Sequence, residues 1–203
     1  MMKRTILTII FLLISYPVIM AQGHQVGDIA STFSLKNVDG NMVSPDDEAY
    51  ADAEGYIIVF TCNSCPYAVA YEDRIIDLHH TYAPQGYPVI AINPNATRPA
   101  ADSYDNMIIR ASEKSFPFPY LFDETQEITT AYGAKRTPHI YLLQKEANGE
   151  KIVRYIGALD NNAMDAASAD VNYVGNAISQ LKAGETVETS STRAIGCGIK
   201  WIQ

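Results

Sequence analysis

Two cysteines separated by two residues, Cys62 and Cys65, lie where an apolar run ends and a helical pattern begins. The run from Tyr56 to Thr61 is rich in β-branched and aromatic residues, which is typical of a strand covered on both faces. The helical pattern starts at Pro66. The first amides of a helix are unpaired, and the aligned peptide dipoles place partial positive charge there. We therefore expect a thiolate to be favoured at this position, and a thiolate is the nucleophile in disulfide exchange.

The segment after the cysteines predicts a strand–helix–strand unit. Its apolar residues recur at alternating intervals of three and four and form one stripe: Ala68, Tyr71, Ile75, Leu78 and Tyr82. Glu72 falls off that stripe, and the turn at 84–86 ends the helix. Residues 88–93 then form a second apolar run. Such a crossover makes the two strands parallel, and we expect them to be neighbours.

The rest of the chain predicts a hairpin before this unit and helices and a second hairpin after it. Turn residues at 38–40 indicate the first hairpin, within an extension over 22–55, and Asn148-Gly149 joins strands at 139–144 and 151–156. Helices are expected at about 102–115, with Tyr104, Ile108 and Ala111 inward; at 124–132, ended by Gly133; and around Val171, Val174, Ile178 and Leu181, ended by Gly184. Residues 116–121 are expected to form a connector or a short strand.

The N-terminus has the pattern of a secretory signal peptide. A short basic stretch, Lys3-Arg4, precedes an almost wholly apolar run over 5–20, and Ala21 suits the position before a cleavage site. An uncleaved N-terminal anchor is the alternative. We expect residues 1–21 to be removed and residues 22–203 to form one domain that is secreted or periplasmic, without membrane insertion after cleavage.

Charge and cysteine content restrict the kind of partner and site. Loss of residues 1–21 would move the formal charge from −8 to −10, because both removed charges are basic. Such an acidic surface argues against binding of nucleic acid or anionic membranes. The chain has 3 cysteines, whereas a domain held together by disulfides usually carries four or more. The pattern therefore indicates a redox site rather than a disulfide scaffold.

Five segments together resemble the thioredoxin superfamily, in its envelope redoxin branch of alkyl hydroperoxide reductase and TlpA-type proteins. The segments are Phe60–Tyr67, Ala91–Pro94, Phe118–Asp123, Arg136–His139 and Ile195–Trp201, and the likeness extends over about 26–201. It implies an α/β thioredoxin-like fold, with a central mixed sheet flanked by helices, an N-terminal hairpin extension and an inserted helix. A thioredoxin-like fold serves many chemistries, so the substrate does not follow from it.

The resemblance implies a thiol–disulfide oxidoreductase. Cys62, which we expect to be open to solvent, would attack the partner disulfide, and the more buried Cys65 would resolve the mixed disulfide. Asn63 and Ser64 would set the ring geometry and donate hydrogen bonds toward the Cys62 sulfur. Pro138 would follow a cis peptide bond and face the cysteines. The exposed backbone of Thr137 would pair with an extended substrate segment. Partners would be protein thiols or disulfides and a redox donor, with no cofactor and no metal, and we expect a monomer.

Two departures from the family patterns qualify this interpretation. Thioredoxin carries a buried acid six residues before its first cysteine, whereas this chain has Tyr56 there, which leaves water or another acid such as Glu72 to accept a proton from Cys65. The peroxiredoxin positions for Pro and Thr hold Gly55 and Val59. We therefore do not expect peroxidase activity of that type.

Several alternatives stay open at this stage. A copper or zinc carrier could use both cysteines of the motif with His139, since thiolates suit these metals, although His139 could equally be a packing residue. A non-catalytic peptide-binding domain is a third hypothesis. Cys197 could be a further redox partner, a metal ligand or a small buried hydrophobe, and Trp201 favours a docked tail. The direction of exchange, oxidation or reduction, does not follow from the motif.

Overall fold

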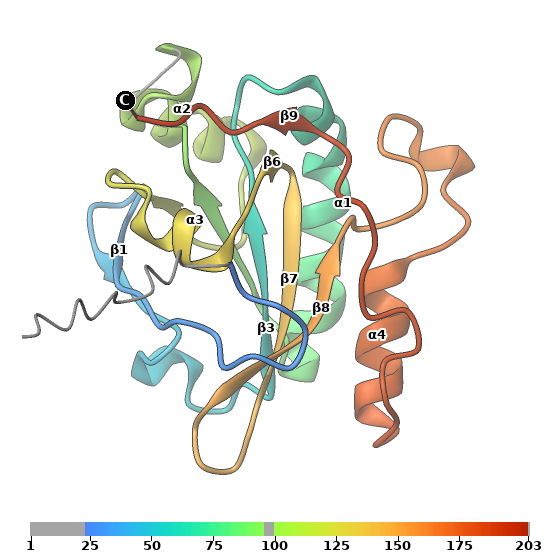
Figure 1. Cartoon of the computed structure of the whole chain (residues 1–203). Helices are drawn as coiled ribbons and strands as arrows, with labels where there is room; N and C mark the ends of the chain where they lie inside the picture. The colour runs from blue at the N-terminus through green and yellow to red at the C-terminus, as the bar shows by residue number, and fades with distance from the viewer. Residues whose placement is uncertain (1–22, 96–99, 203) are drawn as a thin grey trace, which may run out of the picture.

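The computed structural model describes residues 23–95 and 100–202 (Figure 1). The predicted signal peptide, residues 1–21, therefore lies outside the described residues. The strands are β1 (Leu35–Asn37), β2 (Met42–Val43), β3 (Gly55–Phe60), β4 (Val89–Asn93), β5 (Tyr120–Phe122), β6 (Arg136–Thr137), β7 (His139–Lys145), β8 (Lys151–Gly157) and β9 (Cys197–Gly198). The helices are α1 (Pro66–Tyr82), α2 (Tyr104–Lys114), α3 (Glu127–Tyr132) and α4 (Tyr173–Lys182), with short 3-10 turns at Glu48–Tyr50, Ala83–Gln85, Ala100–Asp102 and Ala166–Ser168.

A mixed sheet of 7 strands, in the order β2-β1-β5-β4-β3-β7-β8, forms the centre of the molecule. β3 runs parallel to β4, and β4 runs parallel to β5, which confirms the strand–helix–strand unit. β7 and β8 pair antiparallel across the Asn148-Gly149 turn, and β1 and β2 form the N-terminal hairpin. β6 and β9 form a separate two-stranded sheet. The predicted mixed sheet with an added hairpin is confirmed.

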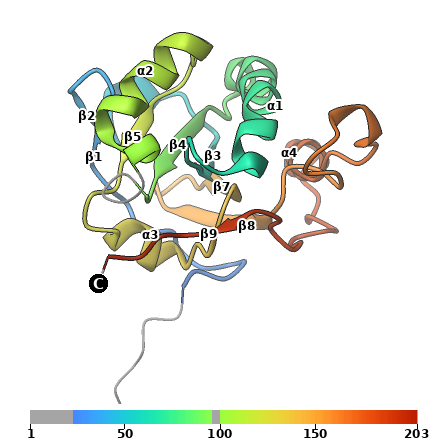
Figure 2. The same ribbon diagram turned by 90° about the horizontal axis from the view of Figure 1, so that it is seen from above.

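Helices cover both faces of the sheet (Figure 2). α1, α2 and α4 contribute Tyr71, Met107 and Val174 to one apolar cluster, whereas Tyr132 of α3 belongs to the cluster on the other face. β3 supplies alternate residues to the two clusters, and all six of its residues are buried. This placement explains its continuous apolar sequence.

The inserted helix α2 turns a different face inward from the one expected. Met107 is fully buried, whereas Ile108 is 40% exposed, so the prediction that Ile108 points inward is wrong. Tyr104 and Ala111 are only partly buried against the core. The three-residue spacing from Met107 back to Tyr104 and the four-residue spacing to Ala111 define the inward stripe. Ile108 lies one position off it.

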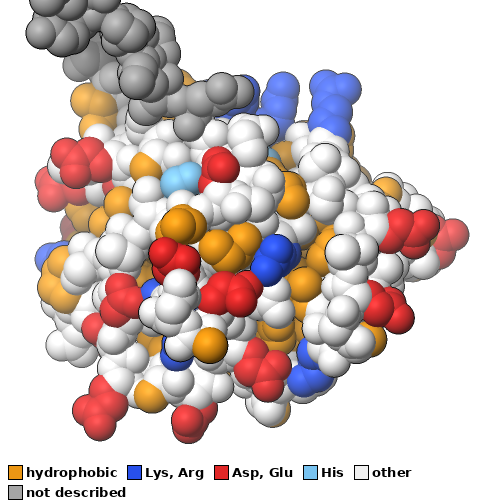
Figure 3. Space-filling model, turned by 60° about the horizontal axis from the view of Figure 1, so that its bottom comes forward, with side chains coloured by type: hydrophobic (Ala, Val, Ile, Leu, Met, Phe, Trp, Pro, Cys, Tyr) orange, Lys and Arg blue, Asp and Glu red, His pale blue; other side chains and the backbone are white. Residues whose placement is uncertain are grey.

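On the face seen in Figure 3, acidic side chains are interspersed with basic and apolar ones. Within the part of the chain described, none of the helices combines the length and apolar character that a membrane crossing requires.

Two glycines that end helices provide a matched test of the fold. Gly133 after α3 and Gly184 after α4 both have left-handed backbone, with φ of 72° and 74°. A Cβ on Gly133 would lie 2.6 Å from the Gly23 Cα, whereas a Cβ on Gly184 meets nothing within 4 Å. We expect Gly184→Ala to lower the free energy of unfolding by about 1–2 kcal/mol, the cost of a left-handed conformation. Gly133→Ala should add a steric cost of about 1–3 kcal/mol.

Urea unfolding followed by circular dichroism measures both changes. An equal decrease in the free energy of unfolding for the two variants would contradict the close contact between Gly23 and Gly133 at the end of α3.

Candidate active site

Strand β3 and helix α1 place the two cysteines of the motif together at one end of the sheet. Cys65 is the N-cap residue of α1, and Pro66 occupies the first turn, where its missing amide hydrogen costs nothing. Cys62 and Cys65 are free thiols in one cluster, and each is only 2% exposed. The prediction that Cys62 is open to solvent is therefore wrong for this conformation. The half-buried Cys197 and Tyr67 pack against the same cluster.

Thr137 contacts both sulfurs. The Thr137–Pro138 peptide bond is cis, as the resemblance implied. The Cys62 Sγ lies 3.2 Å from the Thr137 Oγ1, and the Cys65 Sγ lies 3.1 Å from the Thr137 carbonyl oxygen. The residue before the cis proline is thus in direct contact with both atoms that could exchange disulfides.

The backbone of Thr137 is already paired. β6 and β9 run antiparallel, with Thr137 opposite Cys197, and Thr137 has no exposed surface. The Cys197 amide donates to the Cys65 Sγ at 3.3 Å. The expectation of an exposed Thr137 backbone is therefore wrong here, because the C-terminal segment of the same chain occupies that edge.

The two sulfurs of the motif share a proton unequally. The pKa of Cys65 is lowered because its sulfur accepts a hydrogen bond from the Cys62 thiol, with further help from Cys197. The pKa of Cys62 is raised by the same hydrogen bond, then by burial and by the nearby charge of Asp102. In this closed arrangement negative charge therefore resides on Cys65, at the start of the helix, rather than on Cys62.

A buried carboxylate that the sequence analysis missed fixes the loop between the cysteines. The Ser64 amide and hydroxyl donate to Asp102 at 2.7 Å each, and Asp102 has no exposed surface. Asn95 donates to the same carboxylate at 3.3 Å. Asp102 lies in a 3-10 turn far along the sequence, and no local motif signals it. A buried acid beside the cysteines thus exists, but not at the Tyr56 position where thioredoxin has one.

Asn63 and Ser64 do not donate toward the Cys62 sulfur, which corrects the expectation for both. The Asn63 side-chain amide donates to the Ala101 carbonyl at 2.9 Å, and its oxygen accepts from the Tyr120 hydroxyl at 3.0 Å. Both loop residues therefore anchor the motif to the segment around Asp102. They hold the loop between the two cysteines in place instead of stabilising a thiolate on Cys62.

Glu72 is buried and ion-paired, although its sequence position lies off the apolar stripe. Arg110 of α2 binds both carboxylate oxygens, with Nε donating to Oε1 at 2.8 Å and Nη2 to Oε2 at 2.5 Å. Glu72 and Cys62 line one small cavity of about 10 Å³, which has room for no more than one water molecule. The Glu72 carboxylate is bound by Arg110 and not by Cys65, so the structure does not place Glu72 as the proton acceptor for Cys65.

In the described part of the chain, the His139 ring is hydrogen-bonded to Lys135 and not to a cysteine. Its Nδ1 accepts from the Lys135 amide at 3.4 Å, and its ring packs on Tyr141 at 4.9 Å between centroids. Burial lowers its pKa to about 4, so the imidazole is neutral at physiological pH. Among residues 23–95 and 100–202, no group of three or more His, Cys, Asp or Glu side chains is arranged to hold a metal ion.

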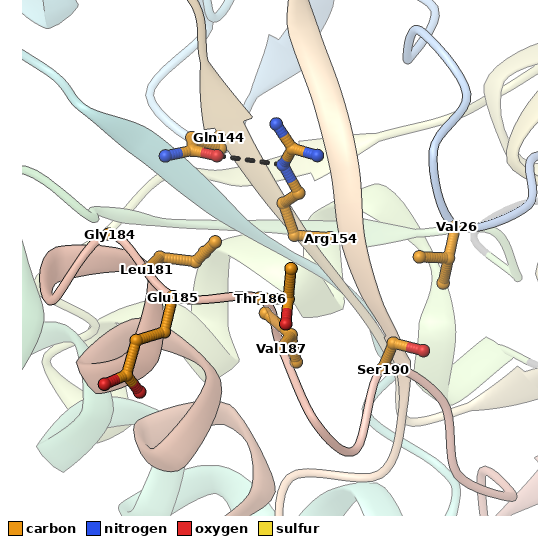
Figure 4. A pocket seen from close by; sticks show the side chains of 9 residues that line it. All are labelled: Val26, Gln144, Arg154, Leu181, Gly184, Glu185, Thr186, Val187 and Ser190. Carbon is orange, nitrogen blue, oxygen red and sulfur yellow. Dashed lines mark hydrogen bonds between the residues drawn. The ribbon is translucent and has the colours of Figure 1, made fainter.

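A surface hollow of about 440 Å³ lies at the other end of β7 and β8 (Figure 4). Arg154 enters it and is already bound, by Gln144 at 2.8 Å and Glu146 at 2.6 Å. The residues that line it include no thiol. Its position and chemistry separate it from the cysteine cluster, so the cluster is the candidate active site.

The sequence profile of the AhpC/TSA family matches residues 26–156. The chain belongs to the AhpC/TSA family. The match extends over both strands of the βαβ unit, the motif cysteines and the β7–β8 hairpin. It ends before α4 and β9, so Cys197 lies outside the matched region. No relative was found among the curated proteins.

Solved structures support the thioredoxin-like fold of this family member. An uncharacterised conserved protein from Geobacillus kaustophilus is 36% identical, with 88% of this chain and 93% of that chain covered and a TM-score of 0.78. A hypothetical protein from Sinorhizobium meliloti is 27% identical, with coverage of 89% and 97% and a TM-score of 0.78. A thiol-disulfide oxidoreductase from Bacteroides fragilis, 15% identical with coverage of 64% and 89% and a TM-score of 0.51, shares the fold alone.

The buried charge of Asp102 should control the acidity of Cys62. In a Cys65→Ser, Cys197→Ser background, Cys62 is the sole thiol, and we expect Asp102→Asn to shift its alkylation to lower pH. The reason is that a nearby negative charge raises the pKa of Cys62 by disfavouring the thiolate, so its removal makes the thiolate available earlier in a titration. Iodoacetamide rates measured across pH follow the change.

Asp105→Asn is the control, because it removes the same charge from an exposed site on α2. An equal shift for both variants, or a shift to higher pH for Asp102→Asn, would contradict the role given to Asp102.

Proposed function

We propose that the protein is a thiol–disulfide oxidoreductase that acts on protein disulfides or dithiols through Cys62 and Cys65. The observation that carries this proposal is the contact of both sulfurs with Thr137, the residue before the cis proline. A structural disulfide across two intervening residues would constrain the unfolded chain very little, so stabilisation does not account for the motif. The lowered pKa of Cys65 suits exchange, because this sulfur can attack and leave as a thiolate.

In the proposed reaction the reduced protein transfers two electrons to a partner. In the closed arrangement Cys62 carries the shared proton, so it first gives that proton to the Cys65 sulfur. The Cys62 thiolate then attacks one sulfur of the partner disulfide, which breaks, and the other partner sulfur leaves as a thiolate and takes up the proton from Cys65. The Cys65 thiolate then attacks Cys62 Sγ, the mixed disulfide breaks, and a Cys62–Cys65 disulfide remains. The reverse sequence oxidises a partner dithiol. Because Cys62 is buried, the segment that covers it must move before a partner disulfide can reach it.

We further propose that this exchange takes place outside the cytoplasm, after removal of residues 1–21. The basic start, apolar run and small residue at position 21 support this proposal. An envelope or extracellular location would supply proteins whose disulfides form and rearrange.

Trapping variants test the function and the order of attack. Cys65→Ser should accumulate mixed disulfides at Cys62, because the sulfur that resolves them is gone. Cys62→Ser should reduce insulin no faster than the uncatalysed reaction, since the attacking sulfur is missing. Non-reducing electrophoresis and peptide mapping of the adducts provide the measurement.

Thr130→Ser changes a hydroxyl residue of α3 that bonds to the Gln126 backbone and not to a cysteine, and it serves as a control. The proposal fails if the wild-type protein exchanges with neither insulin nor glutathione and Cys65→Ser forms no adduct.

A further inference from the structure

The C-terminal strap, which we define as residues 195–202, lies across the candidate active site. β9 within it pairs with β6, and in Figure 1 the red C-terminal segment crosses the same end of the molecule as β6. The Arg136 guanidinium donates to the Gly196 carbonyl at 2.9 Å, and the Ile199 amide donates to the Lys135 carbonyl at 3.3 Å. The strap therefore adds a strand to the edge that the family resemblance assigns to an incoming substrate segment.

The C-terminal half of the strap, residues 199–202, is held by two buried side-chain amides and by one apolar side chain of its own. The Lys200 amide donates to the Asn95 Oδ1 at 2.8 Å. Gln126 is bonded twice, through its Nε2 to the Lys200 carbonyl at 2.8 Å and through its Oε1 to the Ile202 amide at 2.9 Å. Ile199 is 7% exposed and belongs to the core, whereas Trp201 is 45% exposed. The tail is docked as expected, but by hydrogen bonds and Ile199 rather than by Trp201.

The register of this pairing places a cysteine against the motif. Cys197 is opposite Thr137, its amide donates to the Cys65 Sγ at 3.3 Å, and its side chain packs against the cluster that holds Cys65. Cys197 is half-buried at the edge of the cluster, so it is not a fully enclosed core residue. A cysteine in an extended segment, paired beside the motif, is the arrangement required of a substrate cysteine.

We propose that the strap is an internal substrate segment and that Cys197 is a third exchanging thiol, which forms a disulfide with Cys65. This inference rests on the proposed function, which supplies the oxidised Cys62–Cys65 pair. The Cys197 thiolate attacks Cys65 Sγ, the Cys62–Cys65 bond breaks, and a Cys65–Cys197 bond forms. Cys62 leaves as a thiolate and takes up the proton that Cys197 lost. The step rearranges one disulfide and transfers no net electrons.

The rearrangement would alternate the protein between a locked and an accessible form. With Cys65 bonded to Cys197, the strap is held covalently over the Thr137 backbone and an external segment cannot pair there. Attack of Cys62 on Cys65 restores the Cys62–Cys65 disulfide and releases Cys197, after which the strap is held by non-covalent contacts alone. The exchange thereby determines when a partner reaches the site.

Disulfide mapping of two single variants tests the third thiol. In a glutathione redox buffer, Cys62→Ser should form the Cys65–Cys197 disulfide within one chain, because these groups are in contact. Cys65→Ser retains Cys62 and Cys197 and is the matched control. We expect the intrachain disulfide to be favoured at least about tenfold more in Cys62→Ser than in Cys65→Ser, through the higher effective concentration of adjacent groups.

The results separate this inference from the proposed function. Glutathione adducts or dimers in place of the intrachain disulfide in Cys62→Ser would overturn the role of Cys197. If the Cys197→Ser variant still exchanges with insulin in that case, the proposed function stands without it. Absence of exchange in both the wild type and Cys197→Ser would instead reject the function itself.

A pair of glycine variants tests the cover formed by the strap. A Cβ on Gly196 would lie 2.1 Å from the Thr137 carbonyl oxygen, whereas a Cβ on Gly198 meets nothing within 4 Å. Gly196→Ala should therefore displace β9, raise the alkylation rate of Cys62 in the reduced protein at least about tenfold, and reduce the Cys65–Cys197 fraction. Gly198→Ala should leave both unchanged.

Mass spectrometry of the Cys62 peptide gives the alkylation rate, and the thermal midpoint verifies that each variant is folded. A folded Gly196→Ala variant with unaltered alkylation and unaltered disulfide distribution would overturn the proposal.

Discussion

Burial of strand β3 on both faces is the constraint on which the candidate site depends. The strand contributes to the apolar clusters on both faces of the sheet and pairs with β4 on one edge and β7 on the other, so it is held on all four sides. Cys62 follows two residues after that end, and Cys65 then caps α1. β7 brings Thr137 and Pro138 to the same edge, because β6 precedes it directly. The site geometry is therefore a result of how the core is packed.

Elements defined by local patterns were predicted well from the sequence. The β3–α1–β4 unit, the β7–β8 hairpin and the ends of α3 and α4 depend on periodicity, on Asn148-Gly149 and on Gly133 and Gly184. The cis bond before Pro138 followed from the family resemblance. Such features are specified by neighbours in the sequence, so a single chain contains the information.

Features that depend on distant contacts were predicted poorly. Cys62 was expected at the surface because its motif was considered without the distant residues that pack around it, such as Thr137 and Cys197. Ser64 was expected to donate to a sulfur, whereas Asp102, separated from it by 38 residues, receives both of its hydrogen bonds. Glu72 is off the apolar stripe yet buried, because Arg110 from α2 neutralises it. In each case a long-range partner determined the outcome.

The odd number of cysteines has a consequence for the chain as a whole. With 3 cysteines, a single molecule can form one internal disulfide, and one cysteine always remains unpaired, whichever pair is joined. The unpaired cysteine is Cys197 when Cys62 and Cys65 are joined, and Cys62 when Cys65 and Cys197 are joined. The two lie in different surroundings, because Cys62 is buried just beyond the end of β3 whereas Cys197 is half-buried. Formation of an internal disulfide therefore always leaves one thiol that can form a disulfide with a second molecule. Which pair is joined determines where on the protein that second disulfide can form.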